Sequence, residues 1–537
     1  MSTIPTTNIK TSVGSPNYEY ESMIRIWKRT RAILNGELFA KEHDRYIDSV
    51  NYTNLLVPFS PRMSQQQYSW YVAEAELPGL TSQYAKILAG GLLRKPPEID
   101  LPDSLPEEAE VWIRDNFTED GRSMVSFLDN AIWEELSSSR GWVSVDFPVV
   151  TGYGNLSPEQ KQKIAPYPVL WKAEDVINWQ VGTDRATGRP ALTRVVFRYI
   201  SRDFKDSVFH PNLDLVAVDH FLDETGIYRV QYYKKEGAST VDLINGDLRM
   251  TQIFGNELFS NDNWVPKGEQ ITPLMQGEPL TSLPIFPLNG EVQLETPMLT
   301  PIIDREIALY NKVSRRNHLL YGAATFTPVI FSDMGAEDFQ SIVNSGLGSW
   351  IKLNQSDRID AFKTPTDALA DMDRAIEASV AEMARLGIRL LSPEGSSGDS
   401  GVALEIRNSS LTAQLGLLNN KLSQTMKAVI TLMLQWRYGR DIDLTGLEFS
   451  LSADFNPTPI GADWARLATE WYQNRLIPRS VWLSMAKQND LIPSDYNDEL
   501  GIEEINQDNL IQAPGSISIQ DSTEPPEPRK VPQPDAA

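Results

Sequence analysis

The sequence has 537 residues, 41% of them hydrophobic, which is enough for several domains with real cores and excludes a disordered chain. It carries a formal charge of −23 and no cysteine, which excludes disulfides, thiolate metal sites and cysteine nucleophiles. Proteins that bind DNA tightly neutralise phosphates with basic patches, so the acidic excess argues against tight DNA binding and is typical of a soluble surface.

The first part of the chain predicts a flexible arm, residues 1–17, followed by helices with apolar residues three and four positions apart. The second helix is interrupted at Pro78-Gly79 and ends before Pro96, because proline disfavours helix in the residue before it. The predicted helices span residues 18–40, 68–93 and 123–138.

The pattern then alternates with a period of two, and β-branched and aromatic residues are frequent, which is typical of strands. Turn signals such as Glu224-Thr225-Gly226 separate the segments. We expect a mixed, mainly antiparallel β region up to about residue 289, packed on the preceding helices. Its predicted strands span residues 141–150, 176–181, 192–200, 215–222 and 227–234.

Two further helices are predicted over 298–321 and 366–388, and the sequence between them is a small unit whose elements are separated by glycines. This unit predicts a strand over 326–331, a short helix over 336–344 and a strand over 349–353. A pair of helices with a unit inserted at the far end cannot bury its apolar faces alone. It therefore indicates repeated neighbours in a symmetric oligomer.

The longest predicted helix spans about residues 403–438, roughly 50 Å at 1.5 Å per residue. Its apolar residues form one continuous seam at steps of three and four, which also calls for a partner. The seam consists of Leu411, Leu415, Leu418, Leu422, Met426, Val429, Met433 and Trp436.

The last part of the chain predicts a strand over 448–455, helices over 463–472 and 479–487, and a proline-rich disordered tail from residue 509. No apolar run approaches the roughly 18 residues of a membrane span. The polar first residues predict no signal peptide.

The stretch LLSPEGSSGDSGVALEIRN, residues 390–408, raises two chemical alternatives. It has no lysine and lies between helices, so it does not fit a phosphate-binding P-loop. Gly398-Asp399-Ser400-Gly401 resembles the nucleophile segment of chymotrypsin-like proteases, whose serine needs a histidine base held by a carboxylate. None of the four histidines, His43, His210, His220 and His318, has a recognisable partner motif. We expect a flexible loop, and a serine hydrolase using Ser400 stays the alternative.

Asp367, Asp371 and Asp373 crowd the start of one helix, where carboxylates complement the helix dipole. Asp367 and Asp371 share a face and Asp373 does not, and no histidine or calcium-loop glycine accompanies them. We expect a solvated helix start, no metal, no cofactor and no enzymatic activity.

Several stretches, taken in order, resemble the portal proteins of tailed double-stranded DNA bacteriophages, over about residues 18–440. Each phrase is short, and the resemblance lies in their shared order. The stretches are Tyr84–Pro102 (YAKILAGGLLRKPPEIDLP), Ser137–Val150, Lys172–Val181, Leu320–Phe331, Gly348–Asn354 and Ser400–Leu418.

The resemblance implies an α+β portal fold with an α/β wing, a two-helix stem, a small α/β clip, a long wing helix and a helical crown. The implied segments are the wing 18–296, first stem helix 297–322, clip 323–365, second stem helix 366–389, tunnel loop 390–402, long wing helix and strand 403–456, crown 457–508 and disordered tail 509–537. The region after residue 457 matches least.

The implied function is a ring of twelve subunits at one capsid vertex of the virion, assembled in the bacterial cytoplasm. DNA would pass through its channel during packaging and ejection. Implied partners are further copies of this chain, double-stranded DNA, the terminase, a neck or tail adaptor and the major capsid protein. Another oligomeric head–tail connector component is a further alternative.

The resemblance also assigns residues, none of them catalytic. The tunnel loop lining the channel comprises Ser392, Glu394, Gly395, Ser396, Ser397, Gly398, Asp399, Ser400 and Gly401. The clip that docks terminase and adaptor includes Phe326, Val329, Phe331, Asp333, Glu337, Trp350 and Lys352. In the stem we expect basic residues of one subunit to pair with acids such as Asp367 and Asp371 of its neighbour, and DNA contact is the alternative. The basic residues are Arg305, Lys312, Arg315 and Arg316.

Overall fold

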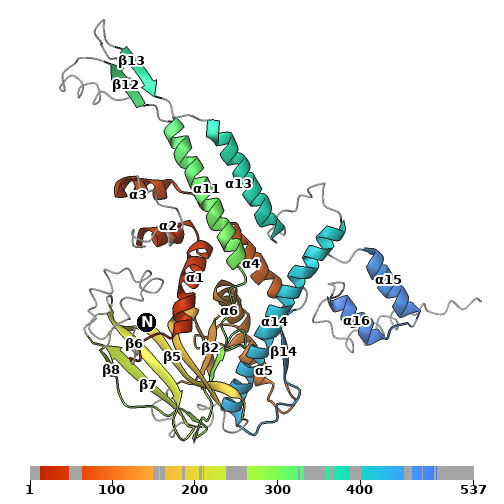
Figure 1. The fold of residues 1–537 in the computed structure, drawn as a ribbon. Helices are drawn as coiled ribbons and strands as arrows, with labels where there is room; N and C mark the ends of the chain where they lie inside the picture. The colour runs from red at the N-terminus through yellow and green to blue at the C-terminus, as the bar shows by residue number, and fades with distance from the viewer. Residues whose placement is uncertain are drawn as a thin grey trace, which may run out of the picture. The chain divides into compact units, whose positions relative to one another are not determined.

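The computed structural model describes residues 12–46, 63–148, 157, 164–183, 188–204, 209, 211–236, 263–324, 327–331, 358–362, 367–386, 401–452, 462–474, 476–488 and 492. The chain divides into two compact units, residues 1–456 and 457–537. The first unit combines helices with antiparallel sheets, which confirms the α+β class (Figure 1). Within the described ranges, no helix has the length and apolar character needed to cross a membrane.

The N-terminal helices follow the predicted order, with one predicted helix divided in two and one helix added. The single helix expected over 18–40 is two helices, because Gly36 adopts φ +98° between them, a conformation that side-chain-bearing residues avoid. The break at Pro78-Gly79 is confirmed, and so is the helix expected over 123–138, for which Ser123 is the N-cap, whereas the fifth helix was not expected. The helices are α1 (Tyr18–Leu34), α2 (Glu37–Tyr46), α3 (Gln65–Glu74), α4 (Leu80–Leu92), α5 (Glu108–Asp115) and α6 (Met124–Ser138).

We expected a mixed, mainly antiparallel β region, and every strand pair that the structure describes is antiparallel. Its largest sheet has the order β4–β5–β6–β7–β8, with β4 (Val176–Thr183), β5 (Pro190–Asp203), β6 (Asn212–Leu222), β7 (Tyr228–Lys235) and β8 (Trp264–Pro266). A second sheet has β2 (Trp142–Asp146) between β11 (Ile285–Pro287) and β3 (Tyr167–Trp171). Two small pairs join β1 (Glu98–Asp100) to β14 (Glu448–Ser450) and β9 (Leu274–Met275) to β10 (Glu278–Pro279).

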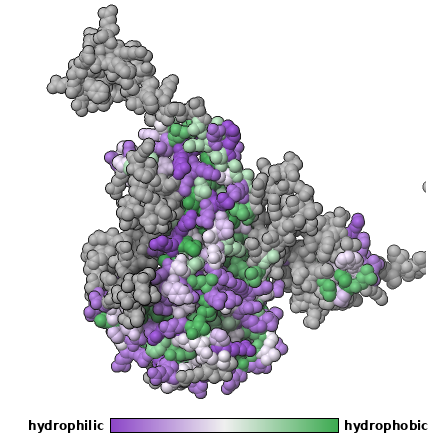
Figure 2. All heavy atoms as spheres, viewed as in Figure 1, coloured by the Kyte–Doolittle hydropathy of each residue, from purple (hydrophilic) through white to green (hydrophobic). Residues whose placement is uncertain are grey.

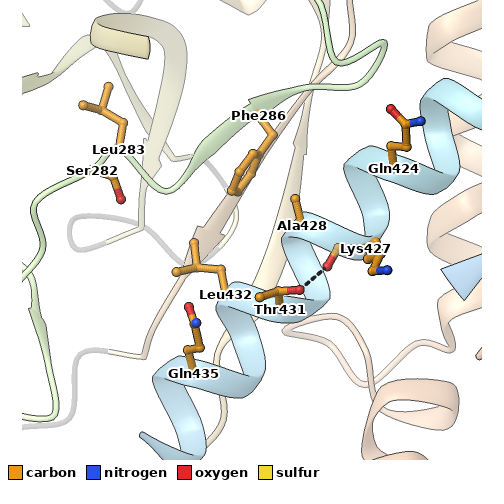
Figure 3. Close-up of a pocket in the computed structure, with 9 residues that line it drawn as sticks. All are labelled: Ser282, Leu283, Phe286, Gln424, Lys427, Ala428, Thr431, Leu432 and Gln435. Carbon is orange, nitrogen blue, oxygen red and sulfur yellow. Dashed lines mark hydrogen bonds between the residues drawn. The ribbon is translucent and has the colours of Figure 1, made fainter. Parts of the chain in front are cut away.

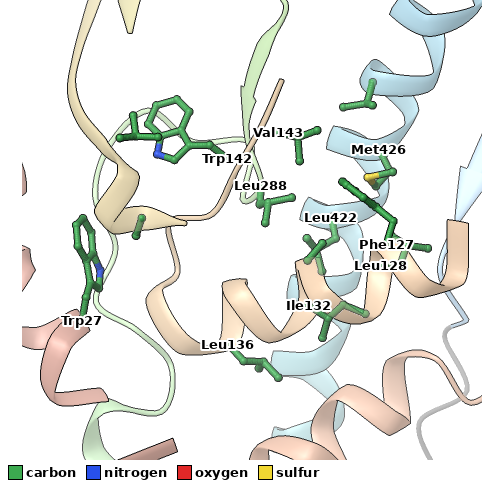
Figure 4. Packing of buried hydrophobic residues seen from close by; sticks show 14 of the residues in the cluster. Trp27, Phe127, Leu128, Ile132, Leu136, Trp142, Val143, Leu288, Leu422 and Met426 are labelled. Atoms are coloured by element: carbon green, nitrogen blue, oxygen red, sulfur yellow. The ribbon is translucent and has the colours of Figure 1, made fainter. Parts of the chain in front are cut away.

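The long helix α14 (Gly401–Tyr438) packs its seam into the core of its own chain (Figure 4). Leu422 and Met426 lie near Phe127, Leu128 and Ile132 of α6. Burying side chains of this size stabilises the fold by about 1.5–3 kcal/mol each. Six seam residues are buried and Leu418 is partly buried, so this part of the seam needs no second subunit, contrary to the expectation. The six are Leu415, Leu422, Met426, Val429, Met433 and Trp436.

A buried arginine ties α1 to α6 and to the short 3-10 helix η3 (Ala173–Asp175). The Nη2 of Arg31 donates to Glu134 Oε1 at 2.6 Å and to Glu174 Oε2 at 2.7 Å. Burial alone raises the pKa of Glu174, but the charge and hydrogen bonds of Arg31 outweigh it and hold that pKa below its usual value. Removing one member would leave an uncompensated buried charge, so this cluster fixes the three elements together.

The second unit contains the two predicted helices, α15 (Ala462–Gln473) and α16 (Arg479–Gln488). Tyr472 stacks on Trp482 with ring centroids 5.4 Å apart. This contact joins the two helices within the unit.

Candidate functional site: a helical hairpin and the long helix after it

The central feature is a helical hairpin made of α11 (Thr300–Ala324) and α13 (Asp367–Arg385). A β-hairpin connects their far ends, β12 (Thr327–Phe331) paired with β13 (Arg358–Phe362) (Figure 1). The helices and the first strand were predicted. The strand at 358–362 was not, and the one expected over 349–353 lies outside the described residues.

Three polar contacts set the antiparallel register of α11 and α13. Arg305 Nη2 lies 3.0 Å from Glu382 Oε1, and Lys312 Nζ donates to Ser379 Oγ at 2.5 Å. Nearer the β-hairpin, Arg316 Nε donates to Asp373 Oδ1. Both members of the Arg305 pair are about half exposed, so this pair contributes little stability and mainly fixes alignment.

Three of the four basic stem residues, Arg305, Lys312 and Arg316, thus find partners on α13 of the same chain, but not the expected ones. Asp371 pairs with Arg374 on its own helix, at 2.9 Å between Oδ1 and Nη2. Asp367 begins α13, and its side chain is outside the described part. Arg315 is exposed. Pairing between subunits stays a prediction.

The base of α11 is anchored to the N-terminal helices. Glu306 is fully buried and accepts hydrogen bonds from the backbone N–H of Leu80 (2.8 Å) and Thr81 (2.7 Å). Gly79, the N-cap of α4, has no side chain to do this. Farther along α11, His318 Nδ1 lies 3.4 Å from Glu74 Oε2. Sequence reasoning missed Glu306, since nothing local links it to α4.

The β-hairpin carries two of the predicted clip residues, Val329 opposite Asp360 and Phe331 opposite Arg358. The other five, Phe326, Asp333, Glu337, Trp350 and Lys352, lie outside the described residues. The same holds for tunnel-loop residues Ser392, Glu394, Gly395, Ser396, Ser397, Gly398, Asp399 and Ser400. Gly401 is the first residue of α14.

A hollow of about 500 Å³ lies between α14 and the chain before and within β11 (Figure 3). Leu283, Phe286 and Leu432 supply apolar surface, and Gln424 and Gln435 supply amides. Its one charged lining residue, Lys427, has its Nζ 3.0 Å from Glu448 Oε2. The lining holds no pair of groups suited to acid–base chemistry.

The two described histidines lie in different surroundings. Burial lowers the pKa of His220 to about 3, and its Nδ1 lies 2.6 Å from the Tyr228 hydroxyl. His318 is held between Glu74 and the ring of Tyr71. Within the described ranges, no cluster of three or more potential metal ligands is found. Both the hydrolase alternative and the absence of a metal stay predictions, since Ser400, His210 and the His43 side chain are not described.

Comparison with known proteins marks the same region. A family described as a domain of unknown function, DUF4055, matches residues 299–437, from the residue before α11 to the penultimate residue of α14. No curated protein matches the chain. The match therefore sets apart the helical hairpin, the β-hairpin and α14 as one unit, and assigns it no activity.

Proposed function

We propose that this protein is the portal protein of a tailed double-stranded DNA bacteriophage. Twelve copies form a ring at one capsid vertex of the virion, and DNA passes through the central channel during packaging and ejection. The β-hairpin end docks the terminase and later the neck or tail adaptor, while the wing contacts the major capsid protein. The protein performs no catalysis and carries no cofactor.

The observation that carries this proposal is the order of elements between residues 299 and 438. A helical hairpin with a β-hairpin at its far end precedes a 38-residue helix, which matches the stem, clip and long wing helix that the resemblance implies. The family match begins and ends with this unit. The antiparallel sheets and helices of residues 18–296 fit the implied wing in class and order.

Composition supports a conduit rather than a DNA-binding protein. A ring of chains that each carry a formal charge of −23 repels DNA phosphates, so DNA would move through it without binding tightly. The segment between Arg389 and Arg407 contains no lysine or arginine, which suits a loop facing moving DNA.

The direct test is negative-stain electron microscopy of purified full-length protein viewed end-on, together with native mass spectrometry. The proposal expects closed rings whose mass is about twelve times the 60.4 kDa of one chain. Only monomers or dimers under all assembly conditions, with no ring at a vertex of virions, would overturn it. A ring located elsewhere in the head–tail connector would favour the connector alternative.

A further inference from the structure

Two opposite charges on the helical hairpin have no side-chain partner among the residues that the structure describes. Among charged residues of α11 and α13 whose side chains are described, only Arg315 and Glu377 have no ion pair or hydrogen bond to another side chain or backbone group. The others, Asp304, Arg305, Glu306, Lys312, Arg316, His318, Asp371, Asp373, Arg374 and Glu382, all do. Both unpaired residues are exposed.

Arg315 and Glu377 lie at the same level of the hairpin. The contacts Arg316–Asp373 and Lys312–Ser379 bracket this level, with Arg315 between the two on α11 and Glu377 between the two on α13. Two charges at equal height in one hairpin would ordinarily be expected to meet. They do not meet in this chain because they lie on different faces.

Helix geometry explains why. Each residue turns the helix by about 100°, so Glu377 is rotated by about 200° from Ser379, which contacts α11. Arg315 is likewise about 100° from Arg316, which contacts α13, and about 100° from the buried Ser314. Glu377 is also about 40° from Asp373, which contacts α11, so Glu377 lies at the flank of the packed face of α13, and Arg315 lies to the side of both packed faces of α11.

The two helices also differ in overall charge. α11 has four lysine or arginine residues against two acidic ones, and α13 has five acidic residues against two arginines. A basic helix followed by an acidic helix is complementary to a second copy placed beside it head-to-tail. Such a heterologous contact, unlike an isologous one, can close into a ring.

We infer that Arg315 of one subunit pairs with Glu377 of the next, and that the occupant of this hairpin surface is a second copy of this chain. The inference rests on the proposed ring. It adds a specific contact that fixes the register between neighbouring hairpins. Exposed apolar residues on the same hairpin, Tyr321 (58% exposed) and Val380 (40% exposed), add contact area, and Figure 2 shows hydrophobic and hydrophilic residues interleaved along the described surface.

Charge reversal tests the pairing. Arg315→Glu and Glu377→Arg, each made in the full chain, should raise the protein concentration needed for half-maximal ring formation about tenfold or more, because like charges then face each other. The double variant Arg315→Glu/Glu377→Arg should restore the parent concentration. Arg202→Glu, an exposed residue of the five-stranded sheet, makes the same charge change as Arg315→Glu and should assemble normally.

Cysteine cross-linking gives a second readout, since the parent chain has no cysteine. Oxidised Arg315→Cys/Glu377→Cys should give a ladder of linked chains up to the closed ring, and each single variant should stay unlinked. A dimer alone would indicate an isologous contact and overturn the inference. Normal assembly of the single reversals, or no rescue by the double variant, would overturn the pairing while the ring stands. No ring from the parent would overturn the proposed function itself.

Discussion

Glu306 Oε2 accepts a hydrogen bond of 2.7 Å from the backbone N–H of Thr81, so a side chain of α11 serves as the N-terminal cap of α4. Its other carboxylate oxygen, Oε1, accepts a hydrogen bond from the backbone N–H of Leu80. Glu306→Ala would leave both amides unsatisfied in a buried site, and we expect it to lower the free energy of unfolding by about 3 kcal/mol. Urea denaturation measures this.

The matched control is Glu377→Ala, an exposed glutamate on the other helix of the hairpin. In dilute, unassembled protein it should change the free energy of unfolding by less than about 0.5 kcal/mol. Equal effects of the two variants would show that the capping contact does not matter.

Stability should fall as pH rises from about 5 to 8, because burial raises the pKa of Glu135 to about 8. In this window an unfolded glutamate has lost its proton while the folded one keeps it. The folded state binds more protons, so raising the pH favours unfolding. Glu135→Gln should therefore flatten the decline and make the protein more stable than the parent at pH 8.

Urea denaturation across this pH range measures the effect, with exposed Asp129→Asn on the same helix as control. Burial also raises the pKa of Asp175, to about 7, so Glu135→Gln/Asp175→Asn should flatten the curve further. Parallel curves for parent and Glu135→Gln would contradict this prediction.

The β-hairpin can be shortened without disturbing its register. Phe331 and Arg358 form the last described pair of β12 and β13, so replacing residues 332–357 with Asn-Gly should close a tight turn there. If this end docks partners, the variant should form rings of normal size and lose binding to terminase and adaptor in co-sedimentation. Undiminished binding would remove the docking role from this segment.

The loop before α14 should matter for DNA but not for assembly. Deleting residues 394–401 should leave rings intact and reduce the length of packaged DNA and infectivity in complementation. Deleting eight residues of the tail, 522–529, is the control for loss of length. Normal packaging by the loop variant would refute the role in the channel.

Periodic elements were predictable, because their signal is local. The seam of α14, the two helices of the hairpin and the main strands were all expected close to their observed bounds. Short strands such as β13 and β11 were missed because three to five residues carry little pattern.

Partners across elements were not predictable. We expected Arg305, Lys312 and Arg316 to pair with acids of a neighbouring subunit such as Asp367 and Asp371. Their contacts with Glu382, Ser379 and Asp373 of the same chain were not foreseen, because the register of an antiparallel helix pair depends on packing. The seam shows the opposite error. An apolar stripe predicts that a helix packs against another element, but does not show whether that element belongs to the same chain. Here α6 and β2 of the same chain cover the stripe.

The unequal anchoring of the hairpin has a mechanical consequence. α11 is joined to the N-terminal helices through Arg29–Asp304, Glu306 and His318, whereas α13 packs mainly against α11 in the described part of the chain. The hairpin is therefore fixed to the rest of the chain mainly through one of its two helices, α11. A load applied at β12 and β13 travels down α11 and meets the contact of His318 with Glu74 before it reaches the amides that start α4.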